Sequence, residues 1–435
     1  MLELAVLADD LTGGMITASA LEAEGVLCPL VTSIEALDHL PAEAEAVVLA
    51  RKIRLVEPSV ARAEALAAVQ AFARLNPRRI YYKYSGVFDS TPRGNIGPIA
   101  EVLLRETGAR QTIFCGALIE RDVTVYEGRM FLQNVPLAES AKRFDPVTPA
   151  FESNLVEALR PQTTLGIGLL PHRILFRGRA AAEAELARLA DRPFIVVDSV
   201  DRDDIARVAE LTVDWPLTTG ADSLTPALAR AWRKTMPDRQ PQRGGRLLPA
   251  VGGRAVVLSG SCAATTLTQL EVFAARHPVW RIDLARDAER PDVVETIVGW
   301  AAEHLAQGPV AIATSGDKAA VAEAQSRFGV QGASEHSDRL IGAVAERLHA
   351  NGVRKFVVAG GETSGQVMAA LGVQQVQVAP LDDMLGGYCH RPGADGISLV
   401  LKPGTYGDTE FLMAALARLE EADAAGEPNS GETYE

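Results

Sequence analysis

The sequence predicts an α/β protein with two domains, each built on a mostly parallel sheet flanked by helices. At 435 residues, the chain has the length of two to three average domains. Short aliphatic and β-branched runs alternate with longer segments rich in Ala, Leu and Glu, which is the pattern of repeated strand–helix units. One stretch rich in proline and glycine interrupts this alternation past the middle of the chain.

The apolar runs locate the expected strands. They cover residues 4–8, 46–50, 79–83, 112–116, 164–169, 194–198, 255–259, 310–314, 356–359 and 397–401. The stretches between them predict amphipathic helices. In one of these, 61–75, residues Ala65, Val69 and Phe72 recur at helical spacing and form an apolar face. Ligands of such sheets bind at the carboxyl ends of the strands, so the residues after each strand are the candidates for chemistry.

The interrupting stretch covers residues 234–253 and reads KTMPDRQPQRGGRLLPAVGG. Its three prolines and four glycines resist both helices and sheet ladders, so we expect an interdomain linker over 236–253. The expected domains are then 1–235 and 254–420. The remaining residues, 421–435, are acidic and have few apolar anchors, which predicts a frayed tail.

Composition excludes several classes of protein. Hydrophobic residues make up 47% of the chain and charged residues 23%, which is typical of a soluble globular protein and too apolar for a disordered one. The 43 Lys and Arg residues against 56 Asp and Glu residues give a net charge of −13. An acidic chain repels phosphate backbones, so we do not expect a nucleic-acid binder. A few local cations can still hold a small anionic substrate.

The cysteines and the N-terminus indicate the compartment. The cysteines lie far apart and show no metal-type spacing, at Cys28, Cys115, Cys262 and Cys389. Unpaired thiols suit a reducing compartment. The apolar start of the chain reaches Asp9 too soon for a signal peptide, and no apolar run is long enough for a membrane span. We therefore expect a soluble, cytoplasmic protein that does not contact membranes.

Two classes of catalytic site have no motif in the sequence. The histidines lack zinc-site spacing, and no GxSxG motif for acyl transfer occurs.

Two acidic residues, Asp9 and Asp10, follow the first strand and precede a glycine turn and a helix. Such carboxylates can accept hydrogen bonds from sugar hydroxyls, and one of them can act as a base. The alternative is structural, because Asp10 or Thr12 can cap the first amides of the helix. Taken alone, the pattern favours the cap. Both roles can hold, since one carboxylate can cap while its neighbour faces a cleft.

The loop after the strand at 79–83 is dense in side chains that bind polyols and carboxylates. They are Lys83, Asp89, Ser90, Thr91 and Arg93. Glycines in the loop let the backbone approach a ligand closely, but a solvated loop that caps the helix expected over 96–105 explains the pattern equally well. Arg54, after another strand, is either a bidentate clamp for a carboxylate or a surface cation.

Three strands of the second expected domain run into loops of small residues. These loops follow Ser259, Ala359 and Leu401, and the second of them contains Gly360, Gly361, Glu362 and Thr363. A double glycine at a helix start leaves free amides that bind phosphate. The chain has neither a GxxxxGK[ST] loop nor a GxGxxG motif. Three such loops in one domain favour a nucleotide phosphate site.

Together these segments resemble the four-carbon acid sugar kinase family, which includes D-threonate, D-erythronate and 3-oxo-tetronate kinases. The resemblance spans about residues 4–413 and rests on ADDLTGG, KYSGVFDSTPRGNIG, the stretch 144–155, AGGETSGQVMAALGV and LVLKPGTYGD, in that order. It implies that the N-terminal domain binds an acid sugar and that the C-terminal domain binds ATP without a Walker loop. Mg²⁺ would then bridge the ATP phosphates.

The resemblance also implies roles for individual residues. On the substrate side they are Asp10, Arg54, Lys83, Asp89, Ser90 and Arg93. On the nucleotide side they are Ser259, Gly360, Gly361, Glu362, Thr363, Lys402 and Gly404. Arg54, helped by Arg93, would hold the substrate carboxylate. Asp10 or Asp89 would accept the proton of the reacting hydroxyl, with a slight preference for Asp89.

The expected activity is ATP-dependent phosphorylation of the terminal 4-hydroxyl of a four-carbon sugar acid such as D-threonate, D-erythronate or a 3-oxo-tetronate. The loop after Lys83 is longer than in threonate kinases and is closer to the 3-oxo-tetronate branch. The connection 380–396 also departs from the family's short form. The alternatives are a kinase for a branched or longer sugar acid and a non-catalytic protein that binds nucleotide and sugar acid. The absence of GxGxxG argues against an NAD-dependent oxidoreductase.

Overall fold

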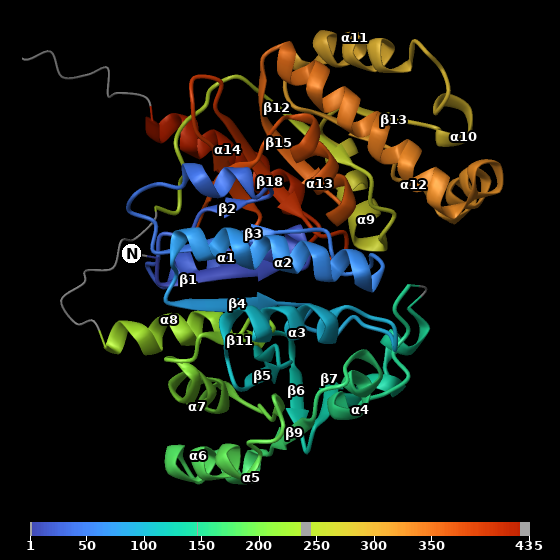
Figure 1. Cartoon of the computed structure of the whole chain (residues 1–435). Coiled ribbons are helices and arrows are strands. Elements are labelled where there is room, and N and C mark those ends of the chain that lie inside the picture. The colour runs from blue at the N-terminus through green and yellow to red at the C-terminus, as the bar shows by residue number, and fades with distance from the viewer. Residues whose placement is uncertain (1, 146, 236–244, 427–435) are drawn as a thin grey trace, which may run out of the picture. The chain divides into compact units, whose positions relative to one another are not determined.

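The computed structural model describes residues 2–145, 147–235 and 245–426. The chain divides into two compact units, Met1–Gly244 and Gly245–Glu435, whose elements are labelled in Figure 1. Each unit has a mainly parallel sheet packed with helices, which confirms the predicted fold class. In the parts of the chain that the structure describes, no helix has the length and apolarity needed to cross a bilayer.

The sheet of the first unit is parallel throughout. Its strands, in spatial order, are β2 (Leu30–Val31), β3 (Ala46–Ala50), β1 (Leu4–Ala8), β4 (Arg79–Lys83), β11 (Leu217–Gly220), β5 (Thr112–Cys115), β10 (Phe194–Val197) and β9 (Ile167–Leu170). The helices are α1 (Leu11–Ala23), α2 (Pro58–Leu75), α3 (Ile96–Thr107), α4 (Leu155–Leu159), α5 (His172–Leu175), α6 (Arg179–Arg188), α7 (Arg202–Thr212) and α8 (Leu224–Lys234). Helix α2 packs on α3, while α8 packs on α1 and α7. The connections through α1 and α2 run in opposite directions along the sheet, so the right-handed crossover rule assigns these two helices to opposite faces.

The connection after β5 is not a simple helix. Between β5 and α4 the chain forms a small antiparallel sheet and three 3₁₀ turns, which we call the excursion (residues 118–154). Its elements are η2 (Ile119–Arg121), β6 (Val123–Tyr126), β7 (Arg129–Leu132), β8 (Val135–Pro136), η3 (Leu137–Glu139) and η4 (Ala141–Phe144). The sequence pattern did not predict these strands, because they are short and partly exposed.

The sheet of the second unit combines parallel and antiparallel pairing. Its strands, in spatial order, are β13 (Val279–Arg281), β14 (Val310–Ala313), β12 (Arg254–Ser259), β15 (Val353–Ala359), β18 (Ile397–Lys402), β17 (Tyr388–Arg391) and β16 (Gln375–Val378). The pairs from β13 to β18 are parallel, and β17 pairs antiparallel with both of its neighbours. The helices are α9 (Ala264–Ala274), α10 (Leu284–Asp287), α11 (Val293–Leu305), α12 (Lys318–Ala350), α13 (Gly361–Ala370) and α14 (Phe411–Gly426). Helix α12 packs on α10, α11 and α13 (Figure 1). Helix α9 packs on α14.

The structure revises the ends of the second predicted domain. Residues 236–244 of the predicted linker lie outside the described residues. Its remainder packs on the second unit, where the amides of Val251 and Gly252 each donate to Asp423 Oδ1 at 3.0 Å. Asp423 in turn accepts from Lys355 Nζ at 2.5 Å. Because these contacts and the burial of Ala422 anchor the chain, α14 continues past the predicted start of the tail at residue 421. Residues 427–435 lie outside the described part.

Candidate functional site

The register of the first sheet aligns the ends of its central strands. Ala8 lies opposite Ala50 on one side and opposite Lys83 on the other, and Lys83 lies opposite Gly220. The residues that follow β1, β3, β4 and β11 therefore meet at one edge of the sheet. This edge is where ligands of open α/β sheets bind.

An ion pair lies at the centre of this edge. Arg54 donates from Nε to Asp9 Oδ2 at 3.0 Å and from Nη2 to Asp9 Oδ1 at 2.7 Å. The Asp9 side chain is 2% exposed. Burial raises the pKa of Asp9, against the attraction of Arg54. Burial also lowers the pKa of Arg54, but Asp9, Asp10 and Asp89 outweigh it and raise that pKa overall. Arg54 is therefore a partly buried, permanently charged partner of carboxylates and not a free surface cation.

Asp10 serves two purposes through one oxygen atom. Its Oδ1 accepts from the Gly13 amide at 2.8 Å, which caps α1, and lies 3.0 Å from Arg54 Nη2. The sequence allowed two roles for Asp10, the helix cap and a carboxylate that contacts substrate. The structure allows Asp10 to fill both roles at once. Within the described residues, the contacts of Asp10 leave its Oδ2 without a partner. With its side chain 32% exposed, Asp10 has an oxygen available to a ligand.

Lys83 holds the next position along the edge. Its Nζ donates to the Tyr84 carbonyl at 2.7 Å and lies 3.2 Å from Asp222 Oδ1. Burial raises the pKa of Asp222, against the attraction of Lys83. A Cβ atom on Gly13 would lie 2.6 Å from Asp10 Oδ1 and 2.9 Å from Lys83 Nζ. Glycine at position 13 therefore allows the lysine and the capping carboxylate to approach each other.

Asp89 completes the cluster. Its Oδ2 accepts from Ser85 Oγ at 2.7 Å and lies 3.9 Å from Arg54 Nη1, while its Oδ1 accepts from Thr148 Oγ1 at 3.1 Å and pairs with Lys142 Nζ. Burial raises the pKa of Asp89, but Lys142, Ser85 and Arg54 more than offset this effect and hold the pKa below its usual range.

The residue before Asp89 adopts an unusual backbone conformation. Phe88 has φ +50°, although it is not glycine, and its ring is buried edge-on against Tyr84 at 5.5 Å. A non-glycine residue in this region costs about 1–3 kcal/mol unless its surroundings hold it there. The buried ring supplies that constraint, so the backbone turns Asp89 toward Arg54.

Two predicted substrate residues are not brought to the cluster. Ser90 Oγ accepts from Gln162 Nε2 at 2.8 Å, and Gln162 Oε1 accepts from the amide of Gly97 at 3.0 Å. Ser90 thus ties its loop to the start of α3. The Arg93 side chain is 83% exposed, and its ion-pair partner among the described residues is Glu57, at 3.4 Å. The assignment of both as substrate-binding residues is not supported by their positions.

Sequence reasoning missed two members of the cluster, Lys142 and Asp222. Lys142 comes from the excursion, which shows no strand pattern that would direct attention to it. Asp222 follows β11, whose short run LTTG is too polar to be recognised as a buried strand. A useful signal was available there, because an acidic residue two positions after a short strand repeats the arrangement of β1 and Asp10.

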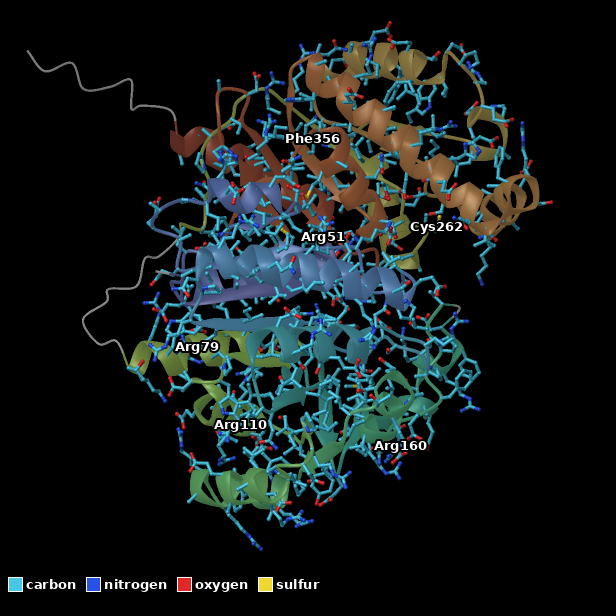
Figure 2. All side chains as sticks on the ribbon, viewed as in Figure 1. Arg51, Arg79, Arg110, Arg160, Cys262 and Phe356 are labelled. Carbon is cyan, nitrogen blue, oxygen red and sulfur yellow. The ribbon has the colours of Figure 1, made fainter. Side chains whose placement is uncertain are left out.

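The second unit has a cavity at the equivalent edge of its own sheet. The register places Ser259 opposite both Ala313 and Ala359, and Ala359 opposite Lys402. The loops that follow these strands line a cavity of about 870 Å³, together with residues of α12. The exposed Cys262, labelled in Figure 2, belongs to the same lining. The predicted residues in the lining are Gly360, Gly361, Glu362, Thr363 and Gly404.

Glycines leave one end of this cavity open. A Cβ atom on Gly260 would lie 2.2 Å from Thr363 Oγ1, and a Cβ atom on Gly404 would lie 2.2 Å from Ser261 Oγ. Gly360 precedes α13 with φ +128°, and its carbonyl accepts from Ser364 Oγ at 2.7 Å. The first amides of α13 and the absence of side chains form a cradle that fits a phosphate group.

Two residues predicted to bind the nucleotide lie outside the cavity lining. Ser259 is fully buried, and its Oγ lies 2.7 Å from Ser315 Oγ, so Ser315 lines the cavity in its place. Lys402 Nζ donates to Thr266 Oγ1 and to the carbonyls of Pro403, Gly404 and Tyr406, at 3.0–3.1 Å. Burial lowers the pKa of Lys402 to about 8, which leaves it charged at neutral pH. Lys402 supports the loop that carries Gly404.

The comparisons with known proteins agree with this arrangement. Residues 4–228 match the family model described as a sugar-binding N-terminal domain, and residues 256–412 match the one described as a nucleotide-binding C-terminal domain. The chain is 34% identical over 421 residues to the 3-oxo-tetronate kinase of Burkholderia multivorans, covering 96% of this chain and 98% of that protein. The chain belongs to the four-carbon acid sugar kinase family.

A further relative has the same printed name, and a solved structure shares the fold. The 3-oxo-tetronate kinase of Pseudomonas fluorescens is 34% identical over 420 residues, covering 96% of this chain and 97% of that protein. A solved structure from Salmonella typhimurium LT2 is 31% identical with a TM-score of 0.83, covering 95% of this chain and 99% of that one. As a member of this family, the protein is a kinase that phosphorylates a hydroxyl group of a sugar acid.

Proposed function

We propose that this sugar acid kinase transfers the γ-phosphoryl group of ATP to the terminal hydroxyl of a four-carbon acid, and that the acid is a 3-oxo-tetronate. The observation that carries the proposal is the cluster at the edge of the first sheet, where Asp10 and Asp89 adjoin Arg54 and Lys83. A hydroxylated acid needs such acceptors for its hydroxyls and a cation for its carboxylate. The names of the relatives support the 3-oxo-tetronate.

Within this mechanism Asp10 accepts the proton. The substrate oxygen forms a bond to the γ-phosphorus, the bond to ADP breaks, and the hydroxyl proton passes to Asp10 Oδ2. The cap on α1 and Arg54 hold Asp10 in place while that oxygen stays available. Both oxygens of Asp89 already accept hydrogen bonds, so Asp89 orients a substrate hydroxyl. The structure therefore favours Asp10 over Asp89 as the base, contrary to the slight preference from the sequence.

Arg54 can offer only one end of its guanidinium to the substrate. Asp9 occupies Nε and Nη2, and Asp10 also approaches Nη2, so Nη1 is the nitrogen that would hold a carboxylate oxygen. A fork-shaped clamp as expected from the sequence would require Asp9 to leave. Positioning of this kind is the main catalytic resource in phosphoryl transfer.

The nucleotide end of the mechanism rests on the cradle formed by Gly260, Gly360 and Gly404. The first amides of α13 would hold phosphate oxygens. The described residues include no group of three or more His, Cys, Asp or Glu side chains that could hold a metal ion. This fits Mg²⁺, which enters kinase sites bound mainly by substrate phosphates, and Glu362 in the cavity lining would hold it. When bound, Mg²⁺ offsets the negative charge of the transferring phosphoryl group.

The direct test is ADP release by the purified protein with Mg-ATP and a panel of acids. The panel contains D- and L-threonate, D- and L-erythronate and the 3-oxo-tetronates. We expect turnover with a 3-oxo-tetronate well above the rate with ATP alone. Turnover with another acid would overturn the substrate assignment. Rates no higher than with ATP alone across the panel, with ATP still bound, would indicate either a substrate outside the four-carbon acids or a non-catalytic binding protein.

Substituting Gly360→Ala tests the cradle. The new Cβ atom would lie 2.9 Å from Thr363 Oγ1 at a backbone angle that L-residues rarely adopt. We expect an increase of about tenfold or more in the KM for ATP, together with a loss of about 1–3 kcal/mol of stability. Gly365→Ala is the matched control, because a Cβ atom there meets nothing within 4 Å and lies inside α13. It should keep the KM and gain about 0.5–1 kcal/mol of stability. An unchanged KM in Gly360→Ala would contradict the cradle.

A further inference from the structure

We propose that Lys142 is a positioning residue of the sugar site, which keeps Asp89 ionised and fixes the direction of its carboxylate. The proposal rests on the proposed function and adds Lys142, a residue of the excursion, to the sugar site. Lys142 lies in η4, well separated in the sequence from the strand ends that form the rest of the cluster.

The contacts of Lys142 use all the donors of its ammonium group. Its Nζ pairs with Asp89 Oδ1 and donates to Asp145 Oδ2 at 2.7 Å and to Thr148 Oγ1 at 2.9 Å. Thr148 Oγ1 in turn donates to Asp89 Oδ1 at 3.1 Å. Lysine and threonine thus reach the same oxygen of Asp89 from one side. The opposite oxygen is held by Ser85, so the carboxylate has a single orientation.

The turn that carries Lys142 is itself fixed. Asp145 Oδ1 accepts from the amides of Val147 and Thr148 at 2.9 and 2.7 Å, and the Ser140 hydroxyl accepts from the amide of Lys142 at 3.1 Å. The Lys142 side chain is 13% exposed, so water competes little for its charge. A well-ordered lysine with three acceptors can define the position of a carboxylate in a way that a mobile surface lysine cannot.

The excursion is anchored to the end of the main sheet as well. Asp198, which follows β10, is fully buried and accepts from the amides of Glu127 and Gly128 at 2.8 Å each. Backbone hydrogen bonds at 2.9 Å join Val125 and Ser199 in both directions. The excursion is therefore held at β10 at one end and at Asp89 at the other. Its position sets where Lys142 lies relative to the substrate cluster.

The charges around Asp89 predict the effect of removing Lys142. Lys142 faces Asp89 from η4, Asp145 lies beyond that lysine, and Arg54 faces it from the loop after β3 at 3.9 Å. Arg54 is shared with Asp9 and Asp10. Without Lys142, the cation that remains close to Asp89 among the described residues is this shared arginine, and Asp145 becomes a like charge without its lysine partner.

The experiment measures the titration of the Asp89 carboxyl by ¹³C NMR in the ligand-free protein, with Asp89→Asn used to assign the signal. In Lys142→Met we expect the midpoint to rise by about 1–3 pH units, because a close opposite charge is lost. The acid limb of the pH profile of kcat/KM should move upward by a similar amount. Arg143→Met is the matched control, since this neighbouring cation is exposed and, within the part of the chain that the structure describes, contacts the Ala138 carbonyl and the Phe151 ring. Arg143→Met should change neither the midpoint of the Asp89 titration nor the acid limb of the pH profile of kcat/KM.

The conservative variant separates charge from geometry. Lys142→Arg keeps the charge but replaces a compact ammonium group by a planar fork. It should leave the Asp89 midpoint near that of the natural protein while raising the KM for the acid more than it lowers kcat. An unchanged Asp89 midpoint in folded Lys142→Met, or an equal shift in Lys142→Arg, would overturn the proposal. A shifted midpoint in a protein that phosphorylates no acid would refute the proposed function and leave the role of Lys142 standing.

Discussion

Substituting Asp10→Asn is expected to lower kcat by about 10²- to 10⁴-fold, the range that a positioned general base contributes. Asparagine caps helices as well as aspartate does, so the hydrogen bond to Gly13 and the start of α1 should survive. The variant therefore removes the proton acceptor and little else. Steady-state kinetics with Mg-ATP and the preferred acid measures the effect, and a thermal melt checks the fold.

Asp89→Asn provides the comparison for this result. Asp89 is proposed to orient a substrate hydroxyl, so its loss should raise the KM for the acid more than it lowers kcat. Near-normal kcat in Asp10→Asn would rule out Asp10 as the base. A loss in Asp89→Asn that falls entirely on kcat would transfer the role of base to Asp89.

Substituting Arg54→Met is expected to have the largest effect on stability. It leaves the buried Asp9 without its bidentate partner, and breaking a buried ion pair in this way costs about 3–5 kcal/mol. It also removes Nη1, so the KM for the acid should rise by about tenfold or more. Denaturant unfolding and steady-state kinetics measure the two effects.

The stability deficit of Arg54→Met should depend on pH. Without Arg54, burial raises the pKa of Asp9 further above its ordinary 3.8, because the opposing attraction is lost. The native variant then keeps a proton that the unfolded chain releases above about pH 4, so the unfolded state binds fewer protons and stability falls as pH rises. The deficit relative to the natural protein should be smallest near pH 4 and should grow toward pH 7.

Arg51→Met is the matched control for this variant. Arg51, labelled in Figure 2, follows the same strand. It pairs with Glu64 at 2.6 Å, and both side chains are partly exposed. Ion pairs of this kind contribute about 1 kcal/mol or less. Its loss should change neither the KM nor the pH dependence of stability. If the loss of stability in Arg54→Met did not depend on pH, the attribution of that loss to the buried Asp9 carboxyl would be wrong.

The predicted strands are present in the structure because they are continuous aliphatic runs, which are typical of strands buried on both faces. The strand over 4–8 agrees in both bounds with β1. The missed strands lack such runs. Strand β16, which reads QVQV, and strand β11, which reads LTTG, are half polar. Strand β11 also pairs with β4 and β5, which are distant from it in the sequence. Only the completed sheet makes these segments strands.

The sequence by itself predicted the two α/β units and placed Asp10, Arg54, Lys83 and Asp89 after strands, while the resemblance to a family placed these four residues together on the substrate side. Local patterns are sufficient there, because parallel strands end at a common edge. Tertiary structure alone decided the partners. It buried Asp9 on Arg54, turned Lys402 toward loop carbonyls and Arg93 toward solvent, and brought Lys142 to Asp89. Such pairings depend on distances between segments remote in sequence, and no local pattern encodes a distance through space.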